Sequence, residues 1–233
     1  MNFFFHRHLA ERDLGSAAAG LGAMLPDLWR MADRRMRAKA GVQLLTPVGL
    51  GVEHHLEMDA WFHHRPIFLD GQAATGKAFA QVQAPRMRLF AHVAWEMCLD
   101  GALVRALGVD AALRDLRRSL GWGLDDLMEE AVRAHRPRIG DEPLARLLTR
   151  LRELLDSLER GEWVAGYAEP AGLVRRLEGV RRRFDFDVLP DGARWAAEAA
   201  FADLLDLAAG RLDEMLAGSL GVATVSPDGA PVH

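Results

Sequence analysis

The stretch GVEHHLEMDAWFHHRP, residues 51–66, holds an unusual density of histidines and acids. If it forms a helix, His55, Asp59 and His63 follow one another at four-residue steps and lie along one stripe. Side chains four residues apart on a helix are close enough to bind a common metal ion. The ends of the stripe are roughly 12 Å apart along the helix axis, so one ion is not expected to bind both histidines. The spacing therefore predicts either two ions with Asp59 between them or one ion bound by half of the stripe.

A second stripe follows in RLFAHVAWEMCLDGALV, where His92, Glu96 and Asp100 repeat the four-residue spacing among apolar residues. Burial of an unpaired carboxylate is costly, so these acids must be paired, bound to a metal or exposed. Two helices that each present histidine and carboxylate can form a metal site in the core of a helical bundle. We therefore expect helices over residues 48–66 and 87–106 that pack against each other, with both stripes facing one pocket.

The mixture of imidazole and carboxylate indicates which metals are expected. Such ligands suit Mn, Fe or Mg better than a structural zinc ion, which prefers thiolates. The stripes thus predict a divalent metal cofactor of one or two ions. A histidine four residues from an acid can also be no more than a pair at the surface, and we expect this for His54 or His64.

Helical periodicity dominates the rest of the chain, and strand signals are nearly absent. Leucines recur at three- and four-residue steps in residues 143–161, and residues 193–218 are rich in alanine, the best helix former. We expect an all-α fold, with one multi-helix domain over residues 1–218. The polar residues 219–233 contain proline and glycine, which predicts a disordered tail.

The composition excludes several classes of protein. A net charge of −4 over 233 residues argues against non-specific nucleic-acid binding. Cys98 is the only cysteine, so no internal disulfide forms, which fits a reducing compartment. The sequence shows neither a signal peptide nor an apolar run long enough to span a membrane. We therefore expect a cytoplasmic protein that binds neither nucleic acid nor a membrane.

Four stretches resemble motifs of the acyl-carrier-protein phosphodiesterase family. The start, MNFFFHRHLA, resembles the family's Met-Asn-Phe-x-x-His-x-His-Leu-Ala, and GAMLPDL is similar to its Gly-Asn-Leu-Leu-x-Asp-Phe, which places Asp27 on the family's aspartate. GVEHHLEMD is similar to Gly-x-x-x-His-Arg-x-Ile-Asp and places His55 and Asp59 on that histidine and aspartate. Pro66 matches the proline that closes this motif. WEMCL resembles an aromatic residue followed by Asp-His-Phe-Leu and places Glu96 on the aspartate.

The resemblance covers about residues 1–105 and includes departures. Leu56 replaces the family's arginine, and the family's Asp-His becomes Glu96 and Met97. His92, one turn earlier, can return an imidazole to the same helix face. Because acids and histidines still fill both stripes, we interpret the changes as a rebuilt set of ligands in a divergent relative.

The family belongs to the HD-type metal-dependent phosphohydrolases, which are all-helical, and removes the phosphopantetheine arm from acyl carrier protein. The resemblance thus implies a metal-dependent phosphohydrolase or phosphodiesterase that uses a metal-activated water. The implied metal ligands are His55, Asp59, His63, His92, Glu96 and Asp27. His6 and His8 would orient ligands or donate a proton to the leaving oxygen, and Asp27 is a third catalytic candidate.

A carrier-protein substrate would also need a docking surface. Acyl carrier protein is acidic and helical, so a basic face is expected to meet it. The arginine-rich stretch VRRLEGVRRRF, residues 174–184, could form that face. Two other classes of protein stay open: a di-iron oxidase or oxygenase with the same kinds of ligand, and a non-catalytic helical binding protein.

Overall fold

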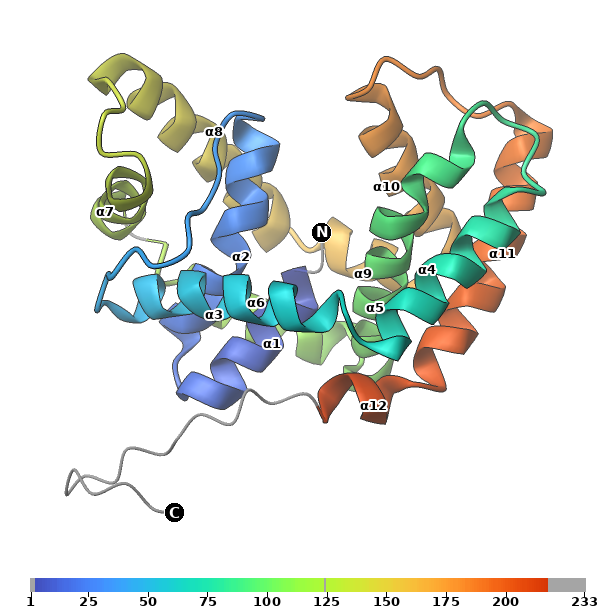
Figure 1. The fold of residues 1–233 in the computed structure, drawn as a ribbon, viewed down its shortest axis with the longest axis horizontal. Helices are drawn as coiled ribbons and strands as arrows, with labels where there is room; N and C mark the ends of the chain where they lie inside the picture. Colours follow the sequence, from blue (N-terminus) through green and yellow to red (C-terminus); the bar gives the residue numbers. More distant parts are fainter. Residues whose placement is uncertain (1–2, 124, 218–233) are drawn as a thin grey trace.

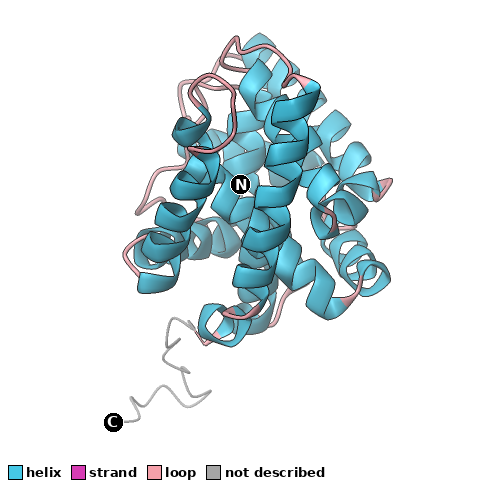
Figure 2. Cartoon of the chain, turned by 90° about the vertical axis from the view of Figure 1, so that its right-hand side faces the viewer, coloured by secondary structure: helices cyan, strands magenta, loops and turns pink. Residues whose placement is uncertain are grey.

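A computed structural model describes residues 3–123 and 125–217, which form helices joined by turns and loops (Figure 2). The described residues contain no strand, so the all-α prediction is confirmed for them. The helices are α1 (Phe3–Leu14), α2 (Ala17–Ala32), α3 (Pro47–Phe62), α4 (Pro66–Phe79), the short 3-10 helix η1 (Met87–Phe90), α5 (Ala91–Leu107), α6 (Val109–Leu120), α7 (Asp125–His135), α8 (Asp141–Glu159), α9 (Glu162–Ala168), α10 (Pro170–Arg182), α11 (Asp191–Ala209) and α12 (Leu212–Leu216). Among these helices, none is both long and apolar enough to cross a membrane. The tail predicted at 219–233 lies outside the described residues.

The helices form two groups, which are side by side in Figure 1. On the left, α2 packs against α1 and α3, with α6 and α8 also in contact with it. On the right, α5 packs against α4, α9 and α11, and α10 packs against α9 and α11. One continuous cluster of buried apolar side chains runs through both groups, from Phe3 in α1 to Met215 in α12.

Proline and threonine set the limits of α3. The Thr46 side chain accepts a hydrogen bond from the Gly49 amide at 3.1 Å and caps the helix, and Pro47 occupies the first turn. The helix ends at Phe62, earlier than the predicted 66, because Pro66 disfavours helical backbone in the residue before it and instead begins α4. His63 is consequently the residue that ends the helix, outside its regular backbone.

Two glycines let α2 and α3 approach until their backbones touch. A Cβ atom at Gly22 would lie 2.0 Å from the Val48 carbonyl oxygen, and one at Gly51 would lie 2.0 Å from the Ala19 carbonyl oxygen. No side chain fits at either position. This contact sets the position of Asp27 on α2 relative to the residues of α3.

The expectation that the helices carrying the two stripes pack against each other was wrong, but residues of both stripes do line one cavity. The main neighbour of α3 is α2, those of α5 are α11 and α4, and α1 contacts both α3 and α5. The first residues of α1, Phe3, Phe4 and Phe5, are fully buried in the core. The two stripes therefore meet only where α3 ends and α5 begins, around His63 and Glu96.

Candidate metal centre

Two groups of side chains have the composition and spacing of metal ligands. The first consists of His6, His55 and Asp59, and the second of His63, His92 and Glu96. Within each group the potential donor atoms all lie within 4.8 Å of one another. Nitrogen and oxygen ligands bind at about 2.0–2.2 Å from an ion, so two ligands of one ion are at most about 4.4 Å apart. Each group is thus close to the spacing that one ion requires.

His55 is oriented by the backbone of α2. Its Nδ1 lies 2.7 Å from the Ala23 carbonyl oxygen and must donate the proton, because a carbonyl oxygen only accepts. Burial, together with the charge of His6, lowers the pKa of His55 to about 4, so the ring is neutral at pH 7. The Nε2 lone pair of such a ring is available to a metal ion, and a backbone carbonyl on the other nitrogen is a common support for a histidine ligand.

Asp59 lies between the two groups. Its Oδ1 is 3.7 Å from His6 Nε2 in the first group and 3.3 Å from His63 Nε2 in the second. Burial alone would raise the pKa of Asp59, but the interaction with His6 and the charges of neighbouring histidines lower it to about 2. The carboxylate is therefore ionised and placed between two imidazole clusters.

The second group converges on one oxygen atom. Glu96 Oε1 lies 3.1 Å from His92 Nε2 and 3.4 Å from His63 Nε2. Burial by itself disfavours the charged form, yet these hydrogen bonds help hold the pKa of Glu96 well below its usual range. Burial would likewise lower the pKa of His63, but Glu96 and Asp59 raise it. The Phe68 ring, centred 4.3 Å from that of His63 and 4.9 Å from that of His92, covers this group on one side.

The second group and Asp59 open into a cavity of about 610 Å³. Asp27 also lines this cavity, and its charge acts on His55. Four arginines line it as well: Arg30, Arg34, Arg37 and Arg183. Sequence spacing did not reveal these arginines, because they come from α2, the segment after it and the end of α10, which only the tertiary structure brings together.

The structure thus brings together seven of the eight predicted site residues and leaves out one. The seven are His6, Asp27, His55, Asp59, His63, His92 and Glu96. His8 is in neither group; instead, burial and the charges of Arg7 and Arg12 lower its pKa. Residues two apart on a helix point roughly 200° apart, so His6 and His8 cannot both face the centre. His6 is buried and does not line the cavity, so its position fits a ligand better than a proton donor to substrate.

Two other expectations from the spacing of these residues need correction. His54 is not at the surface: it is buried, with Nε2 3.0 Å from Asp13 Oδ2, whereas His64 is exposed as expected. Asp100, the third residue of the second stripe, accepts a hydrogen bond from the Phe5 amide at 2.9 Å and does not join the centre.

The arginines of residues 174–184 do not form one exposed basic face. Arg181 is buried and donates to the Pro85 carbonyl oxygen at 3.1 Å and to the Asp187 carbonyl oxygen at 3.3 Å. Its neighbour Arg182 is exposed. The helix turns by roughly 100° per residue, which points consecutive arginines in different directions.

The donor set fits a divalent ion that accepts both nitrogen and oxygen. Each group offers two imidazoles and one carboxylate, and the described residues contain no thiolate near them, since Cys98 is buried and burial raises the pKa of its thiol. Mn and Fe accept such mixed ligands, and Mg prefers the oxygens. None of the family models, curated proteins or solved structures compared with this chain matches it.

Proposed function

We propose that this protein is a metal-dependent phosphoester hydrolase, a divergent relative of the acyl-carrier-protein phosphodiesterases with an HD-type fold. The observation that carries the proposal is the pair of three-residue ligand groups joined through Asp59 and His63, beside a cavity rimmed by arginines. The substrates that fit are phosphodiesters and phosphomonoesters, including a phosphopantetheine carrier protein. Cytoplasmic localisation, with neither nucleic acid nor a membrane as partner, belongs to the same proposal.

The charges around the cavity favour a phosphate-bearing substrate. Asp27, Asp59 and Glu96 would repel a phosphate in the absence of a cation. A divalent ion bound by the two groups supplies positive charge and a water of lowered pKa. The arginines at the rim are suited to bind phosphate oxygens through paired N–H donors and hold the phosphorus over the centre.

Asp59→Ala tests the proposal most directly. The protein is purified with Mn²⁺, Fe²⁺ or Mg²⁺, its metal content is measured, and hydrolysis of bis(p-nitrophenyl) phosphate and of holo-acyl carrier protein is assayed. We expect the variant to lose bound metal and hydrolysis, because Asp59 contacts histidines of both groups. The metal-free variant should still fold and should melt slightly below the metal-free wild type, since the part-exposed Asp59 carboxylate interacts favourably with neighbouring histidines.

His64→Ala is the matched control. His64 is exposed and points roughly 100° away from its neighbour His63, so metal content and turnover should stay at wild-type levels. If Asp59→Ala unfolds the protein while removal of metal leaves wild-type melting unchanged, Asp59 is a structural residue and the proposal fails.

Metal analysis also separates the two other classes of function. An oxidase would purify aerobically with stoichiometric iron and a ligand-to-metal absorption band. A non-catalytic binding protein would contain no metal and show no thermal shift with Mn²⁺, Fe²⁺ or Mg²⁺. The arginine rim favours the hydrolase over both, because neither alternative requires an anionic substrate.

A further inference from the structure

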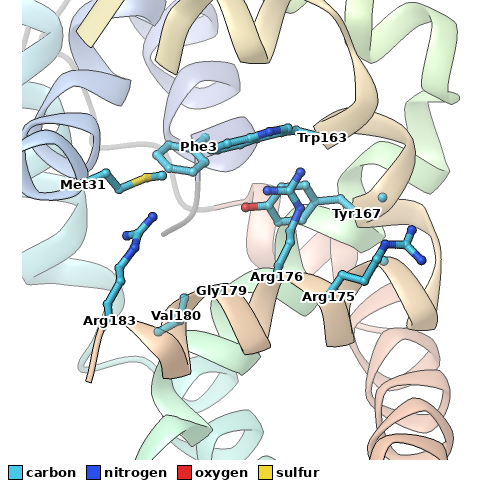
Figure 3. A pocket seen from close by; sticks show the side chains of 11 residues that line it. Phe3, Met31, Trp163, Tyr167, Arg175, Arg176, Gly179, Val180 and Arg183 are labelled. Atoms are coloured by element: carbon cyan, nitrogen blue, oxygen red, sulfur yellow. The ribbon is translucent and has the colours of Figure 1, made fainter. Parts of the chain in front are cut away.

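A second cavity, of about 520 Å³, lies beside α9 and α10 (Figure 3). Phe3 and Trp163 form one wall, and Tyr167 lies beside them. Arginines from α10 line the opposite side, and Figure 3 shows Arg176 and Arg183 extending toward the cavity. The cavity is thus apolar on one wall and cationic on the other.

The second cavity adjoins the cavity of the metal centre. Met31, Val180 and Arg183 line both. An elongated molecule could therefore reach from the metal centre past Met31 and Val180 into the second cavity. Between the two ends it would pass along apolar side chains.

Arg176 is a half-buried cation that forms no ion pair with a carboxylate of the described residues. Its guanidinium carbon lies 4.5 Å from the Trp163 ring centroid and 4.3 Å from that of Tyr167. Among residues 3–123 and 125–217, its Nε has no hydrogen-bond partner and no carboxylate forms an ion pair with it, although the Tyr167 side chain hydrogen-bonds to the guanidinium. Asp100 raises the pKa of Arg176, but burial raises the pKa of Asp100 itself to about 8, so this carboxyl group is mostly protonated at pH 7. A cation removed from water without an anion is unfavourable, and a bound anion would offset that cost.

Arg183 adds a second cation at the junction of the two cavities. Burial and the nearby charge of Arg34 lower its pKa, and Arg34 donates a hydrogen bond to the Arg183 carbonyl oxygen. Arg176 and Gly179 in α10 and Arg183, which caps the end of that helix, follow at steps of three and four residues and so share one face. A Cβ atom at Gly179 would meet no atom within 4 Å, so the space between the two arginines is open.

We propose that the second cavity binds a phosphoryl group at the end of the substrate opposite the ester hydrolysed at the metal centre. This inference rests on the proposed function and narrows its substrate class to elongated molecules with two phosphoryl groups. Arginine is suited to this role because its planar fork of N–H donors matches phosphate oxygens. The apolar lining by Met31 and Val180 fits an uncharged linker between the two groups.

The first test measures binding without metal or hydrolysis. Inorganic phosphate is titrated by calorimetry into the protein in EDTA, with Arg176→Gln and Gly179→Leu as variants. We expect Arg176→Gln to weaken phosphate binding at least tenfold and Gly179→Leu, which fills the open space, to abolish binding in this cavity. Leucine also has a higher helix propensity than glycine, so Gly179→Leu should not melt at a lower temperature.

Arg182→Gln is the control, because Arg182 is exposed on the same helix and lines neither cavity. It should bind phosphate like the wild type. The inference is overturned if wild-type protein binds no phosphate, or if both variants bind it with unchanged affinity.

The second test asks whether the cavity serves the substrate. In the presence of Mn²⁺, hexanediol bisphosphate should have a KM at least tenfold lower than that of hexyl phosphate. Arg176→Gln should remove this difference, whereas Arg182→Gln should keep both the difference and the wild-type kcat, because Arg182 lines neither cavity. An equal KM for both substrates in the wild type would overturn the two-phosphoryl substrate class. Absence of hydrolysis with every metal would instead overturn the proposed function, so the two failures are distinguishable.

Discussion

Two successive turns of α5 carry buried carboxylates that behave in opposite ways. Glu96 accepts hydrogen bonds from two imidazoles, and its pKa is held well below the usual range. Asp100, four residues later, faces the first turn of α1, where the Phe5 amide donates to it at 2.9 Å. Burial raises the pKa of Asp100 to about 8, so that carboxyl group is mostly protonated at neutral pH.

The two carboxylates differ because their hydrogen-bond partners differ in the charge that they can carry. Imidazoles can carry a positive charge and can share a metal ion with a carboxylate, whereas backbone amides satisfy an oxygen without neutralising it. The first turn of a helix has free amides that need an acceptor, and Asp100 supplies one across the core. Helical spacing alone places Glu96 and Asp100 on one stripe. Their neighbours in the fold show that Glu96 is a candidate metal ligand and that Asp100 is a structural residue.

The largest expected effect follows from Glu96→Gln. The amide cannot bind a divalent ion as the carboxylate does, so metal affinity and hydrolysis should fall at least about 100-fold, since even loss of an outer-shell partner costs 10–100-fold. Asp100→Asn should leave both near wild-type values. The measurements are metal content after dialysis and initial rates with Mn²⁺. Equal losses of metal affinity and hydrolysis in both variants would contradict the assignment of Glu96 as a ligand and Asp100 as a structural residue.

Asp100→Ala should have the next largest effect, on stability alone. It leaves amides of α1 without their buried acceptor, which costs about 1–3 kcal/mol of unfolding free energy. Urea unfolding of the metal-free protein measures this loss. Metal affinity per folded molecule should not change, and a large drop in affinity would place Asp100 in the centre after all.

The pH dependence of Asp100→Asn gives a third test. The folded-state pKa of Asp100 is raised to about 8, above the value of 3.8 for an unperturbed aspartate. Between these values the folded state holds a proton that the unfolded state has released, so this residue makes unfolding easier as pH rises from about 4 to 8. Asparagine does not titrate. The melting temperature of the variant relative to wild type should thus increase over this range, and a constant difference would contradict the raised pKa.

The smallest effect is expected for His8→Ala. His8 takes part in neither ligand group and faces away from His6. Metal content and hydrolysis should stay at wild-type values, while His6→Ala should lose metal. A loss of metal in His8→Ala would show that the face of α1 with His8, and not the face with His6, points toward the metal centre.

Local sequence patterns predicted the helices and most of the candidate ligands, because spacing on a helix is a short-range property. The break after α3 was misplaced, although Pro66 marks it, and so His63 was taken as helical. The environments of His54 and Asp100 depend on Asp13 and Phe5, which are distant in sequence and become neighbours only in the fold. The same holds for the arginines at the cavity rim. The surroundings of these residues depend on packing between segments that are distant in sequence. The spacing of residues along one helix gives no information about such packing.

The direct backbone contact between α2 and α3 has a consequence for motion. At Gly22 and Gly51 no side chains lie between the helices that could repack and let one slide past the other. The two helices should therefore move as a unit, and their amide hydrogens should be among the slowest in the protein to exchange with solvent. Asp27 and Asp59 keep a fixed separation in such a unit, so a substrate must adapt to the spacing of these carboxylates.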